Sequence, residues 1–297
     1  MNEIVVNIDN PYALGEEYAL ALGNFDGVHL GHQKLIEYAK KTGLKVAIMT
    51  FEPHPISIIK NIKNLMYITP YCVKKDLFND YLCDVILKVS FDINVMKMKK
   101  EEFIAFLKKI NPKKIICGYD YTFGYMGEGK AIDLSKCFDT IIVSKYMIDG
   151  IRVSSTKIRE YITSGDIDKA NKMLGRPYMI KGVVEHGNAL GRTIGFRTAN
   201  ITHKDYIMPK NGVYLCKIKR GNETLYGMAN VGYNPTINVQ KELRLEVNIF
   251  DFSKDIYGET LEIYFIYHLR DEIKFNSKEE LIEELSRNKE FGIKYFA

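Results

Sequence analysis

The chain has 297 residues, which at about 150 residues per domain predicts two domains or one large one. Its composition, with 46% hydrophobic and 27% charged residues, is that of a globular protein and excludes collagen-like repeats and dominant disorder. The net charge of +5 is too small to indicate a nucleic-acid partner.

Signals for targeting and for disulfides are sparse. No apolar run approaches the roughly 18 residues of a membrane helix, and the N-terminus lacks the basic and apolar regions of a secretory signal. The five cysteines are scattered, odd in number and form no CxxC pair, which favours free thiols in a reducing compartment. We therefore expect a cytoplasmic protein with no membrane or nucleic-acid partner, and the oligomeric state stays open.

The first half of the chain alternates strand-like and helix-like runs. A short apolar run at 18–22 ends in a glycine-rich turn and leads into a helical pattern from about 31 to 40. Further elements are expected as strands at 44–50, 85–89, 114–118 and 140–144 and as a helix at about 101–110. Strands and helices that alternate at this spacing form βαβ units, so this half is expected to be α/β with a parallel sheet.

Two short helices are expected next, at 154–162 and 166–174. Asp166 at the start of the second helix, with Gly175 and Pro177 after it, are typical start and stop residues. Beyond Pro177 the pattern changes to short β-rich runs, separated by turn residues about every ten positions. This pattern predicts an antiparallel barrel or sandwich.

A polar helix closes the chain. It is expected from about Ser277 to Arg287, with Leu281 and Leu285 on one face. We therefore place the domain boundary near residue 176, with an α/β domain over 1–176 and a β-rich domain with a terminal helix over 177–297.

The strongest local motif is GNFDGVHLGH, from Gly23 to His32. It lies where a strand ends and a helix begins, the position at which α/β sheets bind ligands. A helix start supplies free N–H groups and a positive dipole for phosphate. His29 and His32 can face one anion from the first helical turn and neutralise charge on a transferring nucleotidyl group. The alternative is a pair of surface or capping histidines, and the HxGH context favours the phosphate role.

A second phosphate-suited element is VSSTKIR at 153–159. Ser155 and Thr156 offer hydroxyls at a helix start, and Arg159, one turn later, can bind a triphosphate through two nitrogens. Hydroxyl residues at a helix start are more often simple caps. The phosphate-binding interpretation is favoured because the HxGH motif lies in the same predicted domain.

The sequence GYMGEGK at 124–130 fits the GxxxxGK pattern, but we do not interpret it as a P-loop. Ala131 replaces the Ser or Thr that would hold Mg²⁺, and no clear helix is expected to follow. Nearby aromatic residues either border a planar ligand or pack into the core; they are Tyr119, Tyr121, Phe123 and Tyr125.

In the β-rich half, a glycine-spaced loop leads into the sequence FRTAN. Gly187, Gly191 and Gly195 recur every four residues and form a loop able to wrap a nucleotide. Thr198 and Asn200 offer oxygen ligands of the kind that Mg²⁺ takes. The alternative is a hairpin loop in which Thr and Asn have structural roles.

Glu246 lies in the strand-like sequence RLEVNIF, where alternation places it on the same face as Arg244 and Asn248. An acid on a barrel strand can accept a substrate hydroxyl proton in phosphoryl transfer. An isolated strand glutamate is more often solvated, so spacing alone leaves both interpretations open.

Together and in order, these motifs resemble the prokaryotic bifunctional riboflavin kinase/FAD synthetase family over essentially the whole chain. The N-terminal half resembles its Rossmann-like FMN adenylyltransferase domain through GNFDGVHLGHQ, TFEPHP, GYDYTFG and VSSTKIRE. The C-terminal half resembles the riboflavin kinase β-barrel through GRTIGFRTANI, PKNGVY, GMANVGYNPTI, LEVNIFDF, DIYG and LRDEIKF. GDIDKANKMLGRPY resembles the linker between them.

The resemblance implies two reactions on small molecules. Riboflavin would take the γ-phosphoryl group of ATP to give FMN, and FMN would then be adenylylated by a second ATP to give FAD and pyrophosphate. Both reactions would use Mg²⁺, without a protein nucleophile.

For the adenylyltransferase, the resemblance implies that His29, His32 and Arg159 are catalytic residues at the ATP phosphates. Asn24 and Asp26 would shape the loop. The other nucleotide- or flavin-binding positions would be Gly23, Phe25, Asp120, Ser155 and Thr156.

For the kinase, the resemblance implies that Thr198 and Asn200 bind Mg²⁺ and ATP, and that Glu246 is the base toward the ribityl hydroxyl. The remaining nucleotide-binding positions would be Gly187, Gly191, Arg192 and Gly195.

Some positions depart from the family pattern. Arg197 replaces the proline of the usual PTAN motif, which removes a restraint on φ and adds a charge. Thr122 stands where the family often has arginine, and Lys130 supplies a basic group nearby. The alternatives to a bifunctional enzyme are a paralogue that retains only FAD synthetase activity and a non-enzymatic flavin-binding or regulatory protein on the same scaffold.

Overall fold

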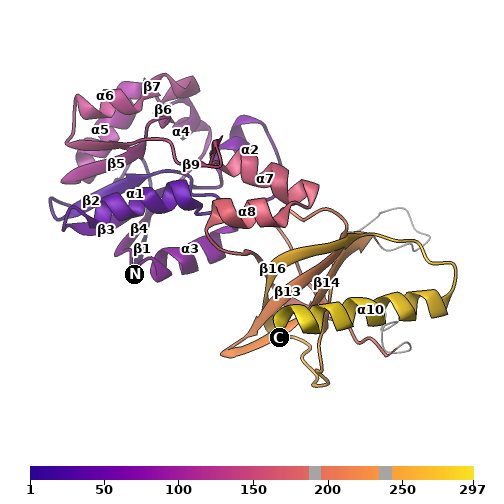
Figure 1. Cartoon of the computed structure of the whole chain (residues 1–297). Helices are drawn as coiled ribbons and strands as arrows, with labels where there is room; N and C mark the ends of the chain where they lie inside the picture. Colours follow the sequence, from indigo (N-terminus) through magenta and orange to yellow (C-terminus); the bar gives the residue numbers. More distant parts are fainter. Residues whose placement is uncertain (187–194, 234–242) are drawn as a thin grey trace. The chain divides into compact units, whose positions relative to one another are not determined.

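The computed structural model describes residues 1–186, 195–233 and 243–297, and the chain forms two compact units, Met1–Ser155 and Thr156–Ala297 (Figure 1). The division falls at the start of helix α7 (Ser155–Ser164), so α7 and α8 (Ile167–Leu174) group with the β-rich part of the chain. The domain boundary near residue 176 stays a prediction.

The first unit contains a six-stranded parallel sheet with the strand order β1–β4–β3–β2–β5–β8, which confirms the predicted α/β architecture. Its strands are β1 (Asn2–Val6), β2 (Tyr18–Leu22), β3 (Lys45–Glu52), β4 (Val85–Ser90), β5 (Lys114–Gly118) and β8 (Thr140–Val143). From β2 the chain moves outward through β3 and β4 and then crosses to β5 on the other side of β2. Ligands bind at the carboxyl ends of the strands where a sheet changes direction in this way.

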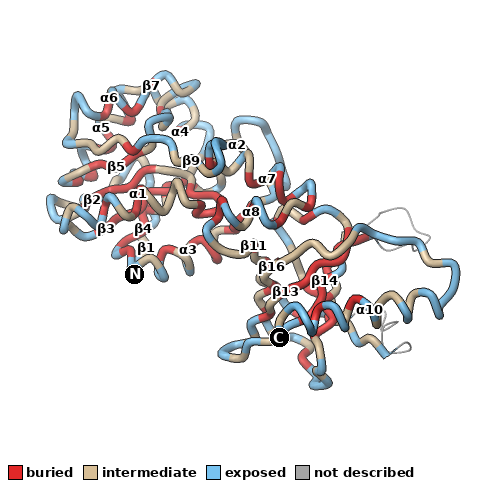
Figure 2. Tube along the Cα trace, in the orientation of Figure 1, coloured by how far each residue is buried: buried red, intermediate tan, exposed pale blue. Residues whose placement is uncertain are grey.

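Helices cover both faces of this sheet (Figure 1). The helices of this unit are α1 (Leu30–Lys40), α2 (Pro55–Ile59), α3 (Tyr71–Asp80), α4 (Ile93–Lys97), α5 (Lys100–Ile110) and α6 (Ala131–Ser135). Leu20 and Leu22 of β2 pack with α5 and α6, whereas Ala19 and Ala21 pack with α1 and α3 on the other face. Burial on both faces explains why the central strands are continuous apolar runs, and these strands are red in Figure 2.

Several elements of this unit were not predicted from the sequence, among them β1, α3 and the short helices α2 and α4. A small antiparallel hairpin of β6 (Thr122–Phe123) and β7 (Gly129–Lys130) occupies the GxxxxGK sequence, with a 3₁₀ turn (Tyr125–Gly127) between its strands. The expectation that no helix follows is wrong, because α6 begins at Ala131. The Lys130 ammonium donates to the Gly127 carbonyl at 2.8 Å and so closes its own hairpin.

The second unit contains a closed antiparallel barrel, which confirms the predicted β architecture and decides for the barrel over the sandwich. Its strands, in order around the barrel, are β11 (Tyr178–Glu185), β12 (Ala199–Ile201), β15 (Leu243–Ile249), β14 (Glu223–Tyr233), β13 (Gly212–Arg220) and β16 (Thr260–Asp271). Alternate residues on β13, such as Tyr214 and Cys216, are fully buried in the barrel. Val213 and Leu215, which alternate with them along the strand, belong to a second apolar cluster.

The terminal helix α10 (Lys278–Phe296) packs over that second cluster. The helix begins where it was predicted, after Ser277, whose hydroxyl caps it by accepting a hydrogen bond from Glu280 N. It continues to Phe296 instead of ending near Arg287. Gly292 permits the close contact, since a Cβ there would lie 2.6 Å from the Phe250 ring. Leu285 of α10 belongs to the same apolar cluster.

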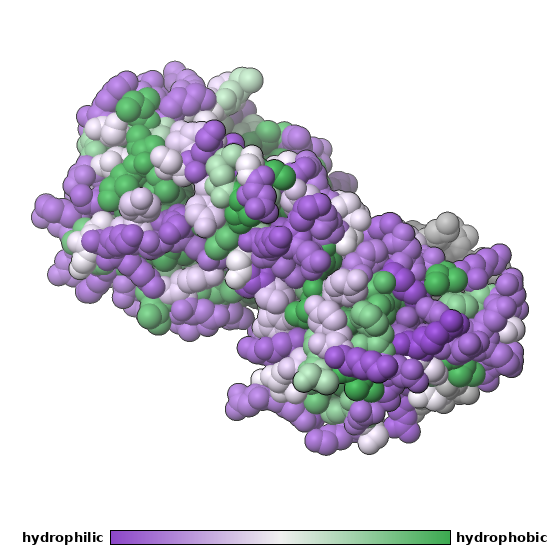
Figure 3. All heavy atoms as spheres, viewed as in Figure 1, coloured by the Kyte–Doolittle hydropathy of each residue, from purple (hydrophilic) through white to green (hydrophobic). Residues whose placement is uncertain are grey.

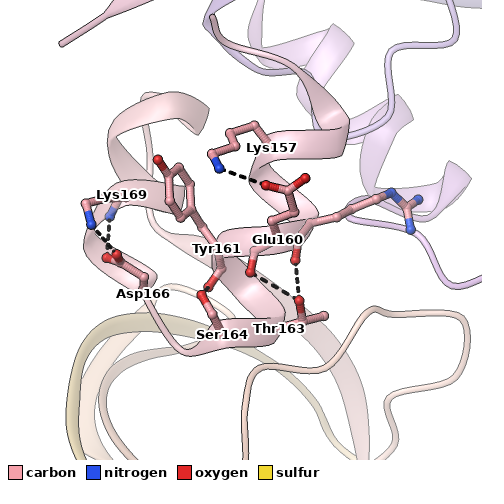
Figure 4. A network of polar contacts seen from close by, with 8 residues as sticks. Lys157, Glu160, Tyr161, Thr163, Ser164, Asp166 and Lys169 are labelled. Atoms are coloured by element: carbon pink, nitrogen blue, oxygen red, sulfur yellow. Dashed lines mark hydrogen bonds and ion pairs between the residues drawn. The ribbon is translucent and has the colours of Figure 1, made fainter. Parts of the chain in front are cut away.

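The helices α7 and α8 confirm the two short helices expected before the barrel. The Asn171 side chain joins α8 to the barrel, donating to Phe265 O at 2.9 Å and accepting from Tyr178 N at 2.6 Å. Figure 4 shows how basic side chains on these helices pair with neighbouring acids. Lys157 contacts Glu160 at 2.8 Å, and Lys169 contacts Asp166 at 2.6 Å.

The visible surface is mostly hydrophilic, with apolar side chains in small groups (Figure 3). Within the described ranges, no helix has both the length and the apolar character needed to cross a membrane. All five cysteines are free thiols.

Candidate active sites

The loop that leaves β2 begins at Gly23, whose N–H donates to Met49 O on β3 at 3.3 Å. Phe25 (φ +53°), Gly27 (φ +87°) and Val28 (φ +40°) all occupy the left-handed region of backbone space. Phe25 and Val28 are fully buried. Non-glycine residues persist in this region only where the surroundings hold them, and such residues cluster at functional sites.

Asp26 fastens this loop from inside the unit. Its Oδ1 atom accepts hydrogen bonds from Ile68 N at 3.0 Å and Thr69 N at 3.1 Å, and the side chain is buried. The backbone carbonyl of Asp26 accepts a hydrogen bond from the Ser155 hydroxyl at 2.8 Å. The two phosphate-suited elements of the sequence therefore meet in the structure at Asp26 and Ser155.

His29 and His32 lie against each other at the start of α1. His29 caps the helix, with its Nδ1 accepting from His32 N at 3.2 Å, so a neutral His29 carries its proton on Nε2. The two rings stack with centroids 3.6 Å apart and planes 12° apart. Gly31 leaves room for this stack, because a Cβ there would lie 3.2 Å from the His29 ring. Two imidazoles at the positive end of a helix dipole can stabilise a phosphate.

A cavity of about 720 Å³ opens beside this loop and is lined mainly by apolar and aromatic residues. The lining includes Asn24, Phe51, His54, Phe91, Met98, Phe103, Tyr121, Phe123 and Tyr125. The cavity falls within the usual size range for cofactor pockets. Tyr121 and Phe123 pack against the sheet core, as one of the two interpretations predicted, and they also border the cavity. That they border a planar ligand stays a prediction. Burial raises the pKa of Tyr121, so it remains a phenol.

Asp120 follows β5 and pairs with Arg152, at the end of the small hairpin of β9 (Met147–Ile148) and β10 (Ile151–Arg152). The Arg152 guanidinium also lies over the Tyr119 ring, 5.2 Å from its centroid. Sequence reasoning missed Arg152, although it immediately precedes the VSST sequence. Both charged side chains are about half exposed, at 48% and 44%.

Thr156 and Arg159 follow Ser155 on α7, in the part of the chain that groups with the barrel. Arg159 is four residues after Ser155, which places the two on the same helical face.

In the second unit, a cavity of about 290 Å³ lies between the barrel wall and α10. Its apolar lining consists of Phe196, Val213, Met228, Ile273, Phe275, Leu281 and Leu285. Leu281 and Leu285 are the pair that the sequence placed on one helical face. Polar groups reach the same cavity from Thr198, Asn230, Glu246, Asn248, Arg270 and Glu272.

Glu246 belongs to a row of residues that crosses five barrel strands. The row runs Arg270, Val213, Asn230, Glu246 and Asn200, each directly opposite the next. Residues directly opposite in antiparallel strands project from the same face. The predicted base Glu246 and the predicted metal ligand Asn200 therefore share one face of the barrel.

A second cavity, of about 200 Å³, is lined by Arg197, Thr198, Lys254 and Tyr257 among others. Thr198 lines both barrel cavities. Arg197 donates to Ser253 O at 3.1 Å, and its own carbonyl accepts from the Asn248 amide at 2.7 Å. The residue that replaces the usual proline is therefore built into the cavity wall.

The glycine-spaced loop is described in part. Gly187, Gly191 and Arg192 lie outside the described residues, whereas Gly195 has φ +80° and immediately precedes Phe196 of the cavity lining. Among the described residues, no cluster of three or more His, Cys, Asp or Glu side chains could hold a metal. Thr198, Asn200 and Glu246 offer oxygen donors alone, which is the donor set that suits Mg²⁺.

Comparisons with known proteins agree with this division of sites. A family model described as FAD synthetase matches residues 13–157, and one described as riboflavin kinase matches residues 174–296. The bifunctional riboflavin kinase/FMN adenylyltransferase of Listeria monocytogenes is 41% identical, over 94% of this chain and 92% of its own. The enzyme of the same name from Bacillus subtilis is 37% identical, over 98% of both chains.

A crystal structure described as a macrolide-efflux protein from Streptococcus pneumoniae matches with a TM-score of 0.88 and 33% identity, over 98% of both chains. Both family models and the high-coverage relatives point the same way. The chain belongs to the family of bifunctional riboflavin kinase/FMN adenylyltransferases and carries both of its modules.

Proposed function

We propose that the first unit adenylylates FMN, with the flavin in the 720 Å³ cavity and the ATP phosphates at the start of α1. Asn24 supports this assignment because it lines the cavity and also belongs to the loop that carries His29 and His32. The FMN phosphate oxygen attacks the α-phosphorus of ATP, and pyrophosphate leaves. His29 and His32 stabilise the charge on the transferring group, so no protein nucleophile is needed.

We assign roles in this site to further residues, on α7 and after β5, because of where they lie in the sequence. Ser155 holds the loop through Asp26 O, and Thr156 and Arg159 of the same helix are proposed to bind the triphosphate. Asp120 and Arg152 are proposed to border the nucleotide or the flavin. Lys130 is not proposed as a replacement for the arginine missing at Thr122, because its ammonium is bound to Gly127 O.

For the kinase, we propose that riboflavin binds in the 290 Å³ cavity and that ATP binds in the 200 Å³ cavity. Thr198 carries this assignment, because it lines both cavities and so marks where the two ligands meet. Glu246 accepts the proton of the ribityl hydroxyl while that oxygen attacks the γ-phosphorus and ADP leaves.

Mg²⁺ is proposed to enter with ATP and to be held by Thr198 and Asn200, with Glu246 on the same face. Such a site fits the preference of Mg²⁺ for few protein ligands and several waters. When bound, the ion neutralises charge that develops on the phosphates.

We propose a cytoplasmic location because all five cysteines are free thiols, as expected in a reducing compartment. Burial raises the pKa of Cys83 and of Cys117 to about 12, so these thiols are poor nucleophiles and suit a structural role. The proposed partners are small molecules: ATP, riboflavin and FMN.

Product analysis of the purified full chain tests both assignments. The chain is incubated with riboflavin and Mg-ATP and, separately, with FMN and Mg-ATP, and the flavins are separated by chromatography. We expect FMN and FAD from the first mixture and FAD from the second. FAD from FMN with none from riboflavin would leave the synthetase alone, and no product from either would overturn the enzymatic proposal.

A further inference from the structure

Lys74 on α3 is a buried lysine that the two reactions described above do not use. Its side chain is 1% exposed, which is rare for lysine unless the ammonium is paired. The ammonium donates to the backbone carbonyl of Asn24 at 3.0 Å. The Thr50 hydroxyl donates to the same carbonyl at 3.2 Å. The loop that carries His29 and His32, here called the histidine loop, therefore has a positive charge bound to its Asn24 carbonyl.

The same ammonium interacts electrostatically with two carboxylates, Asp26 and Glu52. Asp26 belongs to the loop after β2, whereas Glu52 ends β3 and precedes the loop that carries His54. Asn24 and His54 from these two loops both line the 720 Å³ cavity. The buried Lys74 ammonium therefore interacts with the loop after β2 and with the end of β3, and the loops at both places contribute residues to the cavity lining.

We infer that Lys74 is a positioning residue for adenylyl transfer, whose charged ammonium fixes the Asn24 carbonyl and so aligns the histidine loop with the flavin cavity. The inference rests on the proposed adenylyltransferase function of the first unit. Lys74 does not line the cavity, so it acts through Asn24 and does not touch the substrate. A misplacement of about 1 Å at reacting groups is enough to slow a reaction roughly 100-fold.

The charge state of Lys74 gives this role a measurable signature. Burial lowers its pKa below the usual 10.5, although Asp26 and Glu52 oppose that shift. The other charged or titratable groups nearby are Tyr71 on the same helix, with Lys88 and Glu3 beside the Tyr71 ring. Burial raises the pKa of Tyr71, so its phenol keeps its proton where Lys74 loses one. Adenylyl transfer should therefore fall as Lys74 becomes neutral.

Unfolding caused by the titration of Lys74 would not produce the same fall in activity with rising pH. Between the lowered pKa of Lys74 and 10.5, the unfolded chain binds more protons at this residue than the folded chain does. The contribution of Lys74 to the free energy of unfolding therefore rises with pH over this interval. A loss of adenylylation that Lys74 causes there cannot come from its own effect on stability.

The test compares Lys74→Arg and Lys74→Met with Lys75→Met in the full chain. Lys75 is the matched control, because it is the next residue on α3, has a side chain that is 45% exposed and pairs with Glu3 at 2.6 Å. We measure kcat and KM for FMN adenylylation from pH 7 upward, riboflavin phosphorylation by the same samples, and thermal melting.

We expect Lys74→Met to lower the kcat of adenylylation roughly 100-fold while phosphorylation is unchanged. Lys74→Arg should retain activity to higher pH than the wild type, because a guanidinium keeps its charge there. Lys75→Met should reproduce the wild-type profile. A wild-type kcat in Lys74→Met, or the same alkaline fall in Lys74→Arg and wild type, would overturn the inference.

If neither Lys74 variant folds, the wild-type protein decides. An alkaline fall in adenylylation at lower pH than any fall in phosphorylation supports the role of Lys74, and coincident falls overturn it. Absence of wild-type adenylylation at every pH would instead reject the proposed function of the unit, which keeps the two failures distinct.

Discussion

Glu246 on β15 lies directly opposite Asn200 on β12, in a row whose next member, Asn230 on β14, lines the same cavity as Glu246. Glu246 therefore has an asparagine on each side, Asn200 and Asn230, and is the one acidic residue in this row. In the proposed kinase, these two amides flank the base without adding a negative charge to the row.

The first prediction concerns Glu246→Gln. We expect riboflavin phosphorylation to fall roughly 100- to 10,000-fold, because the amide cannot take the ribityl proton. Conversion of FMN to FAD by the same sample should be unchanged. Glu283→Gln on α10 is the control, since that side chain is 71% exposed and pairs with Arg287. Equal phosphorylation by Glu246→Gln and wild type would remove Glu246 from the mechanism.

The second prediction concerns His32→Ala. The stack with His29 disappears, and with it one of the two rings at the start of α1. Adenylylation of FMN should fall roughly 100-fold, the usual order for the loss of one group that stabilises developing charge. Riboflavin phosphorylation should continue, so FMN should accumulate in place of FAD. Simultaneous loss of both activities with an unchanged melting temperature would contradict the assignment of separate sites.

Patterns confined to one element were predictable from the sequence. The apolar runs of β2 and β5 were predicted with the bounds that they have in the structure, because strands buried on both faces carry a strong local signal. Alternation also placed Glu246 and Asn248 on one face, and both line the cavity. β1 was not predicted because it is a short edge strand, in which Val6 alone is buried.

Relationships between distant elements were not predictable in this way. The pairing of Asn200 with Glu246 depends on the register between β12 and β15, which no local pattern encodes. Lys74 gave no signal either, because a lysine on a short amphipathic helix normally faces water. Its burial follows from where α3 packs relative to the loop after β2.

The third prediction concerns Arg197, which stands in place of the usual proline. Its guanidinium donates to Ser253 O and lines the proposed ATP cavity together with Lys254. We expect Arg197→Gln to raise the KM for ATP in phosphorylation roughly tenfold, the order of one charge-assisted hydrogen bond, with little change in kcat. Adenylylation should be unaffected. An unchanged or lower KM in Arg197→Gln, or in Arg197→Pro, would mean that the arginine is merely tolerated.

The last prediction concerns the attachment of α10 to the barrel. Arg270 on β16 lines the proposed riboflavin cavity and pairs with Glu284 of α10, with Nε 3.2 Å from Oε1. The two side chains are only 16% and 20% exposed, so the pair is poorly screened by solvent.

Glu284 lies one turn or less from Leu281 and Leu285, which form the helical wall of that cavity. Burial already lowers the pKa of Arg270, and Glu284 opposes that shift, so removal of the carboxylate leaves a partly buried cation without this partner. We expect Glu284→Gln to destabilise the second unit by roughly 1–3 kcal/mol. The KM for riboflavin should rise severalfold while the KM for FMN in adenylylation stays constant. Steady-state kinetics and thermal melting measure both effects, and an unchanged riboflavin KM despite a lower melting temperature would show that the pair stabilises the fold without shaping the cavity.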